Sequence, residues 1–376
     1  MKVISVFNNK GGVGKSTLTY HLGNSLAELG YKILMVDLDP QCNLTICAMR
    51  EEQLHQIWEE EDPFIDDFEQ AFSNNSNIIN SPRSIHFILK PTEDGISELR
   101  ILPPTLTIAN NIDIIPGRLS IHKYENKIAE RWNGIYQGDN LAIRTVTNIR
   151  SLCKKYAEQN NYDFVLIDTS PSLGILNKTI ISTVDGFFIP AQPDMFSLYG
   201  IRNIGNALEI WQKEFESIYT LISEDKRSKF PTNFVQFLGY AIYNAKKYTK
   251  QGTTPNEYNL AQAHYQYVNQ IPQTILEYIQ ENNRINFTSE EISAPIGGSA
   301  IIHTHNTFPA VAQALKCPMW KVPEIYQQLG QTDTDYIDFL TQNGFEYNQG
   351  NNGRLREIGE HYRDFTNDLL IRINKL

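Results

Sequence analysis

The sequence has few cysteines and no long apolar run. Its four cysteines are Cys42, Cys47, Cys153 and Cys317, and they form no CxxC pair and show no zinc-ligand spacing. We therefore expect reduced thiols and a cytoplasmic location. No uninterrupted apolar segment is long enough to cross a bilayer. The first residues read as a strand rather than as a signal peptide.

Basic residues are scarcer than acidic ones, but the imbalance is local. The chain of 376 residues has 33 Lys and Arg against 43 Asp and Glu, a formal charge of −10. Residues 51–70 contain nine acidic residues and no Lys or Arg, so the rest of the chain has a formal charge of only −1. Net charge therefore does not exclude a local basic face that binds nucleic acid.

Apolar segments alternate with helical patterns, which predicts an α/β fold. Residues 2–7 read as a buried strand, residues 16–29 as a helix and residues 32–39 as a second strand, which together form a βαβ unit. We expect a doubly wound, mostly parallel sheet with helices on both faces. Further strands are predicted at 163–168, 186–192, 237–244 and 291–297, and a helix at 146–159.

Two regions depart from this alternation. Residues 50–109 read as an insertion with a possible hairpin around 93–95. Residues 331–376 read as a helical extension, because apolar residues recur at helical spacing between Leu355 and Leu369. We expect one domain over 1–330, interrupted by the insertion, and an extension packed on it.

The segment NNKGGVGKST at residues 8–17 predicts a phosphate-binding loop. After a strand and before a helix, its backbone N–H groups can face phosphate. Lys15 is expected to reach the β- and γ-phosphates and Ser16 to ligate Mg²⁺. Asn9 breaks the usual G-x-x-x-x-G-K-[ST] pattern, and a glycine-rich turn without nucleotide is the competing interpretation. The predicted nucleotide ligands in this loop are Gly11, Gly12, Val13, Gly14, Lys15, Ser16 and Thr17.

Four motifs, in order, resemble the ParA/MinD superfamily of deviant Walker A ATPases, and ParA-type partition ATPases most of all. They are KGGVGKST at 10–17, VDLDPQCN at 36–43, YDFVLIDTSPSLG at 162–174 and GFFIPAQPDMFSLYGIRNI at 186–204. The resemblance covers the core of residues 1–205. Cys42 stands where a small Gly or Ala is usual, and Ser170 where proline is common.

This resemblance implies roles for individual residues. Lys10 is similar to the signature lysine that reaches the partner's phosphates across a dimer, and Asp39 to the residue that orients the attacking water. Lys10, Lys15 and Asp39 are thus the expected catalytic residues. Asp168 ends a strand at the sheet's carboxyl edge, where it is expected to hold a Mg²⁺-bound water.

The motif at 36–43 resembles the switch I segment of that superfamily, and Asp37 is expected to support this segment or the metal shell. The predicted metal residues are therefore Ser16, Asp37 and Asp168. Asn244 resembles an asparagine that meets the base in related ATPases. Other interpretations stay open: Lys10 as a solvated loop residue, Asp168 as a structural aspartate and Asn244 as a turn residue.

The resemblance implies an ATPase that uses ATP and Mg²⁺ and forms an ATP-dependent homodimer. We expect it to bind nonspecific DNA, to associate with the nucleoid, and to position DNA or other cargo with a ParB-like or adaptor protein that stimulates hydrolysis. Residues 243–252, YNAKKYTKQG, mix lysines with tyrosines as backbone-binding surfaces do, although a solvated loop reads the same way. Four arginines of the extension are further candidates: Arg354, Arg356, Arg363 and Arg372.

Other functions remain as alternatives. A related ATPase could act on a protein or membrane partner without DNA, in MinD-like positioning or in a defence system. Residues 354–376 carry five basic and four acidic residues, so a membrane-binding basic helix is not expected. The absence of a CxxC argues against a bridging metal cluster. A small-molecule kinase or synthetase stays open, although the DLDPQCN motif argues against it.

Overall fold

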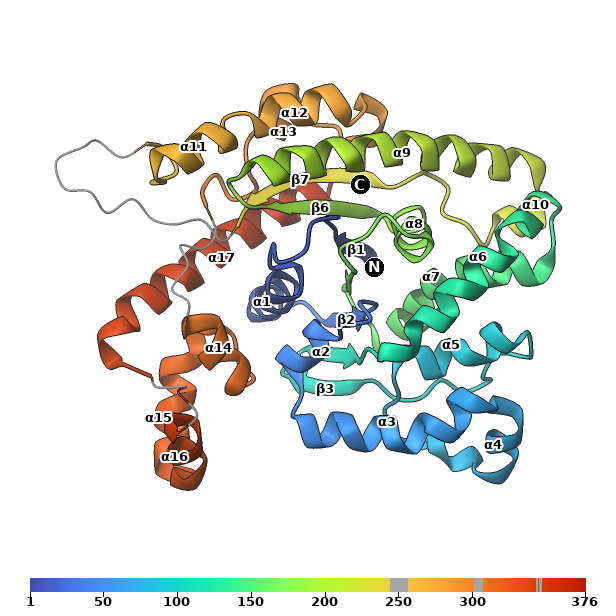
Figure 1. Ribbon diagram of the computed structural model, residues 1–376, viewed down its shortest axis with the longest axis horizontal. Coiled ribbons are helices and arrows are strands. Elements are labelled where there is room, and N and C mark those ends of the chain that lie inside the picture. The colour runs from blue at the N-terminus through green and yellow to red at the C-terminus, as the bar shows by residue number, and fades with distance from the viewer. Residues whose placement is uncertain (244–255, 301–306, 343, 345–346) are drawn as a thin grey trace.

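The computed structural model describes residues 1–243, 256–300, 307–342, 344 and 347–376, and a seven-stranded sheet runs through this described part (Figure 1). The strand order is β3-β4-β2-β5-β1-β6-β7, with every neighbouring pair parallel except β3 and β4. The predicted fold class is confirmed. The strands are β1 (Lys2–Val6), β2 (Ile33–Asp37), β3 (Leu106–Ala109), β4 (Ile112–Ile115), β5 (Phe164–Asp168), β6 (Gly186–Ala191) and β7 (Gln236–Ile242).

Helices cover both faces of the sheet. On one face α1 (Lys15–Glu28) packs on β2 and β5 and lies beside α17 (Asn352–Ile373), while α7 (Asn140–Asn160) lies on the other face (Figure 1). Strands β2 and β5 are buried along their whole length, as strands enclosed on both sides must be. Among the described residues, no helix combines the length and the apolar character that crossing a bilayer requires.

The remaining α-helices form the insertion, the second sheet face and the C-terminal part. They are α2 (Asn43–Ala48), α3 (Glu51–Asp66), α4 (Phe68–Asn74), α5 (Ile85–Asp94), α6 (His122–Tyr136), α8 (Ile175–Ile181), α9 (Met195–Leu221), α10 (Glu224–Arg227), α11 (Gln262–Val268), α12 (Ile271–Tyr278), α13 (Ser289–Ser293), α14 (Thr307–Ala314), α15 (Val322–Thr332) and α16 (Thr334–Gln342).

The insertion is helical where a hairpin was expected. The Ser84 hydroxyl caps α5 by accepting a hydrogen bond from the Phe87 N–H, and the helix continues to Asp94. Gly95 then ends it in the left-handed conformation, at φ 79°. The hairpin prediction was wrong because the glycine is a helix C-cap rather than a turn between strands.

The prediction of a strand at residues 291–297 is also wrong. Thr288 and Glu291 form a reciprocal capping box that starts the short helix α13. Beyond this helix the Ile296 N–H donates to the Tyr240 carbonyl at 2.8 Å, so the segment contacts β7 without forming a strand.

The C-terminal helix packs on the helix that follows the glycine-rich loop. The Thr366 hydroxyl donates to the Ser25 hydroxyl at 2.8 Å, and α17 buries the apolar stripe that its sequence predicts. Arg372 is buried and donates to the Leu238 carbonyl at 2.8 Å, so it does not belong to an exposed basic surface. Helix α15 (Val322–Thr332) continues across residue 330, where we placed the boundary between the domain and its extension. The division of the chain at this residue stays a prediction.

Candidate nucleotide-binding site

The glycine-rich loop joins β1 to α1 and depends on two left-handed glycines. Gly12 and Gly14 have φ of 72° and 80°, a conformation that disfavours other residues. At Gly14 an added Cβ would also lie 2.0 Å from a ring carbon of Tyr243, which follows β7. The loop conformation is therefore set by residues more than 200 positions apart in the chain.

Asn8 ties the start of this loop to the neighbouring strand. Its side-chain amide donates to the Pro190 carbonyl at 2.7 Å, and its Oδ1 accepts the Lys10 N–H at 2.9 Å. Asn9 takes the place of the first glycine of the usual pattern. The loop entrance is thus anchored through side chains to β6.

Lys15 begins α1 and turns back over the loop. Its Nζ donates to the Lys10 carbonyl at 3.2 Å, and the residue is buried. Burial lowers the pKa of Lys15, while the nearby carboxylates of Asp168 and Asp39 oppose that shift. Such a semi-buried ammonium, close to loop amides, suits the binding of a polyphosphate.

Two aspartates lie next to each other where β2 and β5 end. Asp37 and Asp168 are register partners, and both are fully buried. Burial, and then the charge of Asp37, raise the pKa of Asp168 well above its usual value. By distance and angle neither carboxylate oxygen of Asp168 forms a hydrogen bond within the described residues, although the Ser16 hydroxyl lies close enough to lower the pKa of Asp168. A buried carboxyl without partners is costly unless a ligand satisfies it.

Asp37 holds the segment that leads into α2. Its Oδ2 accepts from the Thr45 N–H at 2.9 Å and the Thr45 hydroxyl at 2.6 Å, and its Oδ1 accepts the Asp39 N–H at 3.1 Å. Burial raises the pKa of Asp37 to about 6 despite these bonds. This geometry favours the support of Asp39 over direct metal ligation for Asp37.

The side chain of Lys10 contacts residues that follow β6. Its Nζ lies 2.5 Å from Asp194 Oδ2 and 2.9 Å from Gln192 Oε1. Gln192 in turn donates to the Gly12 carbonyl at 3.0 Å. Lys10 is therefore an ordered, paired residue in this conformation of the chain.

Residues 11–17 of the loop and Asp39 line one cavity of about 240 Å³. The structure brings the loop residues and Asp39 together there, and Asp168 lies close by. It adds residues that sequence reasoning did not assign. Gln41 and Asn43 lay within a quoted motif, whereas Gln313 of α14 had no sequence signal because it comes from a distant part of the chain. Asn244 lies outside the described residues. The added lining residues are Gln41, Asn43, Cys47, Pro171 and Gln313.

The donor set fits a magnesium ion that is shared with a nucleotide. Within the described ranges, no three His, Cys, Asp or Glu side chains are grouped to hold a metal by themselves. Mg²⁺ needs no such group, because it keeps several waters and combines one or two protein ligands with phosphate oxygens. The unpartnered Asp168 carboxylate and the nearby Ser16 hydroxyl are ligands of that kind.

Comparisons with known proteins show the family of the chain. A family model described as an AAA domain matches residues 1–220. The sporulation initiation inhibitor protein Soj of Bacillus subtilis is 28% identical over 216 residues, which cover 57% of this chain and 68% of Soj. The chromosome partitioning protein ParA of Caulobacter vibrioides is 23% identical over 56% of this chain and 62% of its own length.

Solved structures show the same fold. The ParA of pNOB8 aligns with a TM-score of 0.52 and 18% identity, over 99% of this chain and 98% of that one. McdA of Cyanothece, in a complex with ATP, aligns with a TM-score of 0.51 and 14% identity, over 87% of this chain and 96% of its own. With the matched family model and the loop geometry, these findings show that the chain belongs to the AAA-domain family and, within it, to the ParA/MinD-type P-loop ATPases.

Proposed function

We propose that the chain is a Mg²⁺-dependent ATPase that forms a homodimer around ATP and positions DNA or another cargo. The observation that carries the proposal is that Lys15 and Asp39 line one cavity, with the buried Asp168 carboxylate near Lys15 and with Lys10 in the loop that Lys15 turns over. Phosphoryl transfer needs positioning and charge stabilisation more than covalent chemistry, and this grouping supplies both.

Each residue then has a role at a stated atom. The loop N–H groups and Lys15 Nζ bind phosphate oxygens, and Ser16 with Asp168 would hold Mg²⁺ and its water. The ion would neutralise phosphate charge. Asp39 lies 4% exposed in the cavity wall, where its carboxylate would orient the attacking water. Its Oδ1 also accepts the Gln41 N–H at 3.0 Å, which limits its rotation.

Lys10 would act in the partner's site rather than in its own. Within its own chain Lys10 Nζ is bound to Asp194, while Lys15 is the lysine that turns over the loop. A second charge beside the γ-phosphate would stabilise the transition state.

Nonspecific DNA is the proposed surface for the ATP-bound dimer. Arg354, Arg356 and Arg363 are exposed on α17, and the lysines of residues 246–250 lie outside the described residues. Basic residues of this kind bind phosphate without reading sequence. The related Caulobacter protein is named for chromosome partitioning. The proposed setting is therefore the cytoplasm and nucleoid, with an adaptor that stimulates hydrolysis.

The Asp39→Ala variant tests the proposal, because it should bind ATP without hydrolysing it. With ATP, light scattering should give twice the 43.1 kDa mass of the chain, and with ADP the single mass. A gel shift with random-sequence duplex DNA should require ATP and weaken steeply with salt. The double variant Asp39→Ala/Lys15→Ala is the matched control and should stay monomeric. A monomer in ATP would remove the dimer model.

A partner protein in place of DNA is the second candidate, in a positioning or defence system. Helix α3 presents a surface with six exposed acidic residues and no Lys or Arg, which suits a basic protein better than DNA. An ATP-bound dimer that ignores DNA in the gel shift would favour this candidate.

A further inference from the structure

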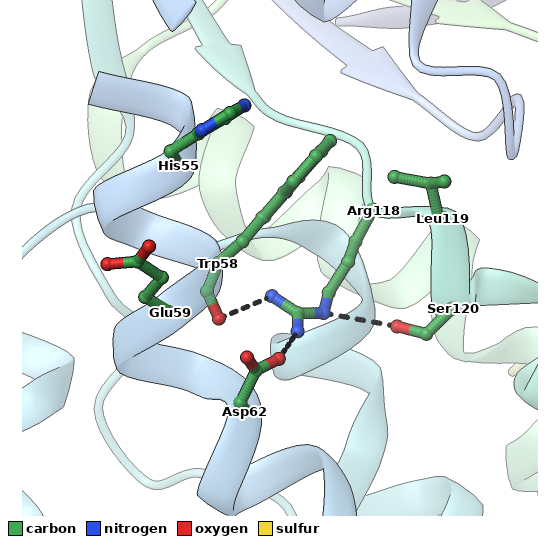
Figure 2. A pocket seen from close by; sticks show the side chains of 7 residues that line it. All are labelled: His55, Trp58, Glu59, Asp62, Arg118, Leu119 and Ser120. Carbon is green, nitrogen blue, oxygen red and sulfur yellow. Dashed lines mark hydrogen bonds and ion pairs between the residues drawn. The ribbon is translucent and has the colours of Figure 1, made fainter. Parts of the chain in front are cut away.

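A second cavity, of about 320 Å³, lies between helix α3 of the insertion and the segment after β4 (Figure 2). Trp58 extends from α3 toward the segment that carries Arg118 and Leu119, and His55 lies one turn earlier on the helix (Figure 2). None of the residues that line this cavity lines the nucleotide site. We call it the α3 recess; it is lined by His55, Trp58, Glu59, Asp62, Arg118, Leu119 and Ser120.

The α3 recess does not suit an anion, because the cation within it is already paired. The Arg118 guanidinium is bound to the carboxylates of Asp62 and Glu61. It also donates to the Trp58 carbonyl at 2.9 Å and to the Ser120 hydroxyl at 3.1 Å. Its side chain is 9% exposed, so little of the guanidinium is left to meet a ligand.

The remaining groups suit a planar cation. Trp58 is half-buried and offers an aromatic wall, with the His55 ring stacked on it at a centroid distance of 6.2 Å. Glu59 and Asp62 are exposed carboxylates that line the recess, and Asp62 also binds the Arg118 guanidinium through Oδ1. A guanidinium combines stacking on an aromatic ring with paired hydrogen bonds to carboxylates, and an ammonium does so less well.

Hydrogen bonds connect the recess to the nucleotide site. The Trp58 Nε1–H donates to the Gly117 carbonyl at 3.1 Å, and the Gly117 N–H donates to the Thr45 hydroxyl at 2.8 Å. That hydroxyl donates to Asp37 Oδ2 at 2.6 Å, and Asp37 Oδ1 accepts the Asp39 N–H. The wall of the recess is thus linked by consecutive hydrogen bonds to the backbone of Asp39.

Close packing around Gly117 restricts the movement of this series of hydrogen bonds. A Cβ added at Gly117 would lie 3.0 Å from Asp37 Cγ and 3.1 Å from Cys42 Sγ. The Gly117 backbone is therefore in direct contact with the side chains of the segment that leads from β2 to α2. A displacement of Gly117 must move Asp37 or Cys42, since packed interiors leave little free space.

We infer that the α3 recess binds an arginine side chain of a partner protein, and that its occupancy is transmitted to Asp39 through Trp58, Gly117, Thr45 and Asp37. The bound guanidinium stacks on Trp58 and holds the indole N–H against Gly117. This stabilises the segment around Asp39 and slows the release of nucleotide. The binding of arginine in the α3 recess does not depend on the proposed function. The transmission of that binding to Asp39 rests on the proposed function.

Binding is tested with N-acetyl-arginine methylamide as the probe, observed by NMR at constant ionic strength. The probe should bind saturably, and the lysine analogue should bind more weakly. Glu59→Gln should weaken arginine binding by about threefold to fivefold, as expected for one partly exposed charge pair. Glu52→Gln removes the same charge from the first turn of the same helix and should leave the affinity unchanged. Equal weakening in both variants, or no saturable binding, overturns the proposed site.

Transmission is tested by the release of a fluorescent ADP analogue at saturating probe. Release should slow by about fivefold, at the lower end of ordinary couplings between two sites. Trp58→Phe keeps an aromatic ring but lacks the indole N–H that bonds to the Gly117 carbonyl. This variant should bind the probe without slowing the release of the ADP analogue. Thr45→Val should also lose the effect, and Thr45→Ser should retain it. Equal slowing in all three variants overturns the pathway.

The two proposals fail in different ways. If the chain binds arginine in the α3 recess and the probe slows ADP release, but ATP is not hydrolysed, the ATPase proposal fails and the recess stands. If ATP is hydrolysed and the probe does not bind, only the recess fails. Circular dichroism of Trp58→Phe and Thr45→Val verifies that each variant is folded before these comparisons.

Discussion

The side chain of Lys10 is bound to Asp194 of the same chain, with Nζ and Oδ2 2.5 Å apart. Asp194 is also the N-cap of α9, where its Oδ1 accepts the Ser197 N–H at 2.9 Å. Burial opposes ionisation of Asp194, but Lys10 and the Ser197 N–H together hold its pKa below the usual value. For Lys10 to reach phosphates on a second chain, it must first leave this carboxylate.

Asp194→Asn should therefore promote dimerisation in ATP. The amide removes the charge that holds Lys10 but still caps α9, since Asn and Asp are equally good N-cap residues. We expect the dimer dissociation constant to fall by about twofold to fivefold, the range of a partly exposed ion pair. Sedimentation in ATP measures the shift.

The matched control for this prediction is Asp194→Ala, which releases Lys10 and removes the cap as well. It should show the same gain in dimerisation together with a loss of about 1 kcal/mol in the free energy of unfolding. A dimer that is weaker in Asp194→Asn than in the unchanged chain would contradict the prediction.

Lys10→Ala should separate nucleotide binding from hydrolysis. In the proposed function Lys15 and the loop amides bind the chain's own nucleotide, so ADP affinity should stay within about twofold. Hydrolysis should fall by about two orders of magnitude or more, as when one donor of transition-state stabilisation is removed. Steady-state phosphate release, next to ADP titration, measures both. Unchanged turnover would defeat a role for Lys10 in the partner's site.

Two glycines of the loop should differ in their tolerance of alanine. Gly12 and Gly14 share a left-handed φ, but an added Cβ at Gly12 meets no atom within 4 Å, whereas at Gly14 it would overlap the Tyr243 ring. Gly14→Ala should thus cost about 1 to 3 kcal/mol more unfolding free energy than Gly12→Ala. Urea unfolding without nucleotide tests this, and equal losses would show that Tyr243 moves freely.

His21 joins the glycine-rich loop's helix to the C-terminal part of the chain. Its Nδ1–H donates to the Thr17 carbonyl at 2.7 Å, and its Nε2 accepts the Met319 N–H at 3.1 Å. The ring also stacks on Tyr362 of α17, at a centroid distance of 5.1 Å. The acceptor nitrogen requires neutral imidazole, and burial lowers the pKa of His21 to about 4.

Acid should therefore weaken the fold through His21. Between pH 6.5 and pH 4 the unfolded chain binds a proton that the folded chain excludes, so stability falls as pH falls in that range. The loss approaches about 3 kcal/mol below pH 4. Asp37 acts in the opposite direction, because its folded pKa of about 6 lies above the unfolded value.

The comparison of the chain with His21→Gln isolates the His21 contribution, since both proteins keep Asp37. Urea unfolding at pH 7 and pH 4.5 should show a stability loss about 2 to 3 kcal/mol larger in the unchanged chain than in the variant. Equal losses would show that His21 takes up a proton as readily in the folded chain as in the unfolded chain.

Local patterns were sufficient to predict the parts of this protein that are contiguous in sequence. The first strand, the glycine-rich loop and its helix lie where the pattern predicts them, because buried strands and phosphate loops have short-range signatures. The errors fell where a local signal had two meanings. A glycine such as Gly95 is common both in hairpin turns and at helix C-caps. Here Ser84 caps the start of α5, and Gly95 ends the same helix.

The sequence by itself determined the family, the loop and the aspartates at the strand ends, since each is encoded by residues within a few positions of one another. Only the tertiary structure decided what surrounds them. Tyr243 packs on Gly14 and Gln313 lines the nucleotide cavity, although neither is near the loop in the chain. The same holds for Lys10. Its place beside the glycines was visible in the sequence, but its ion pair with Asp194 forms because β1 and β6 are neighbours in the sheet.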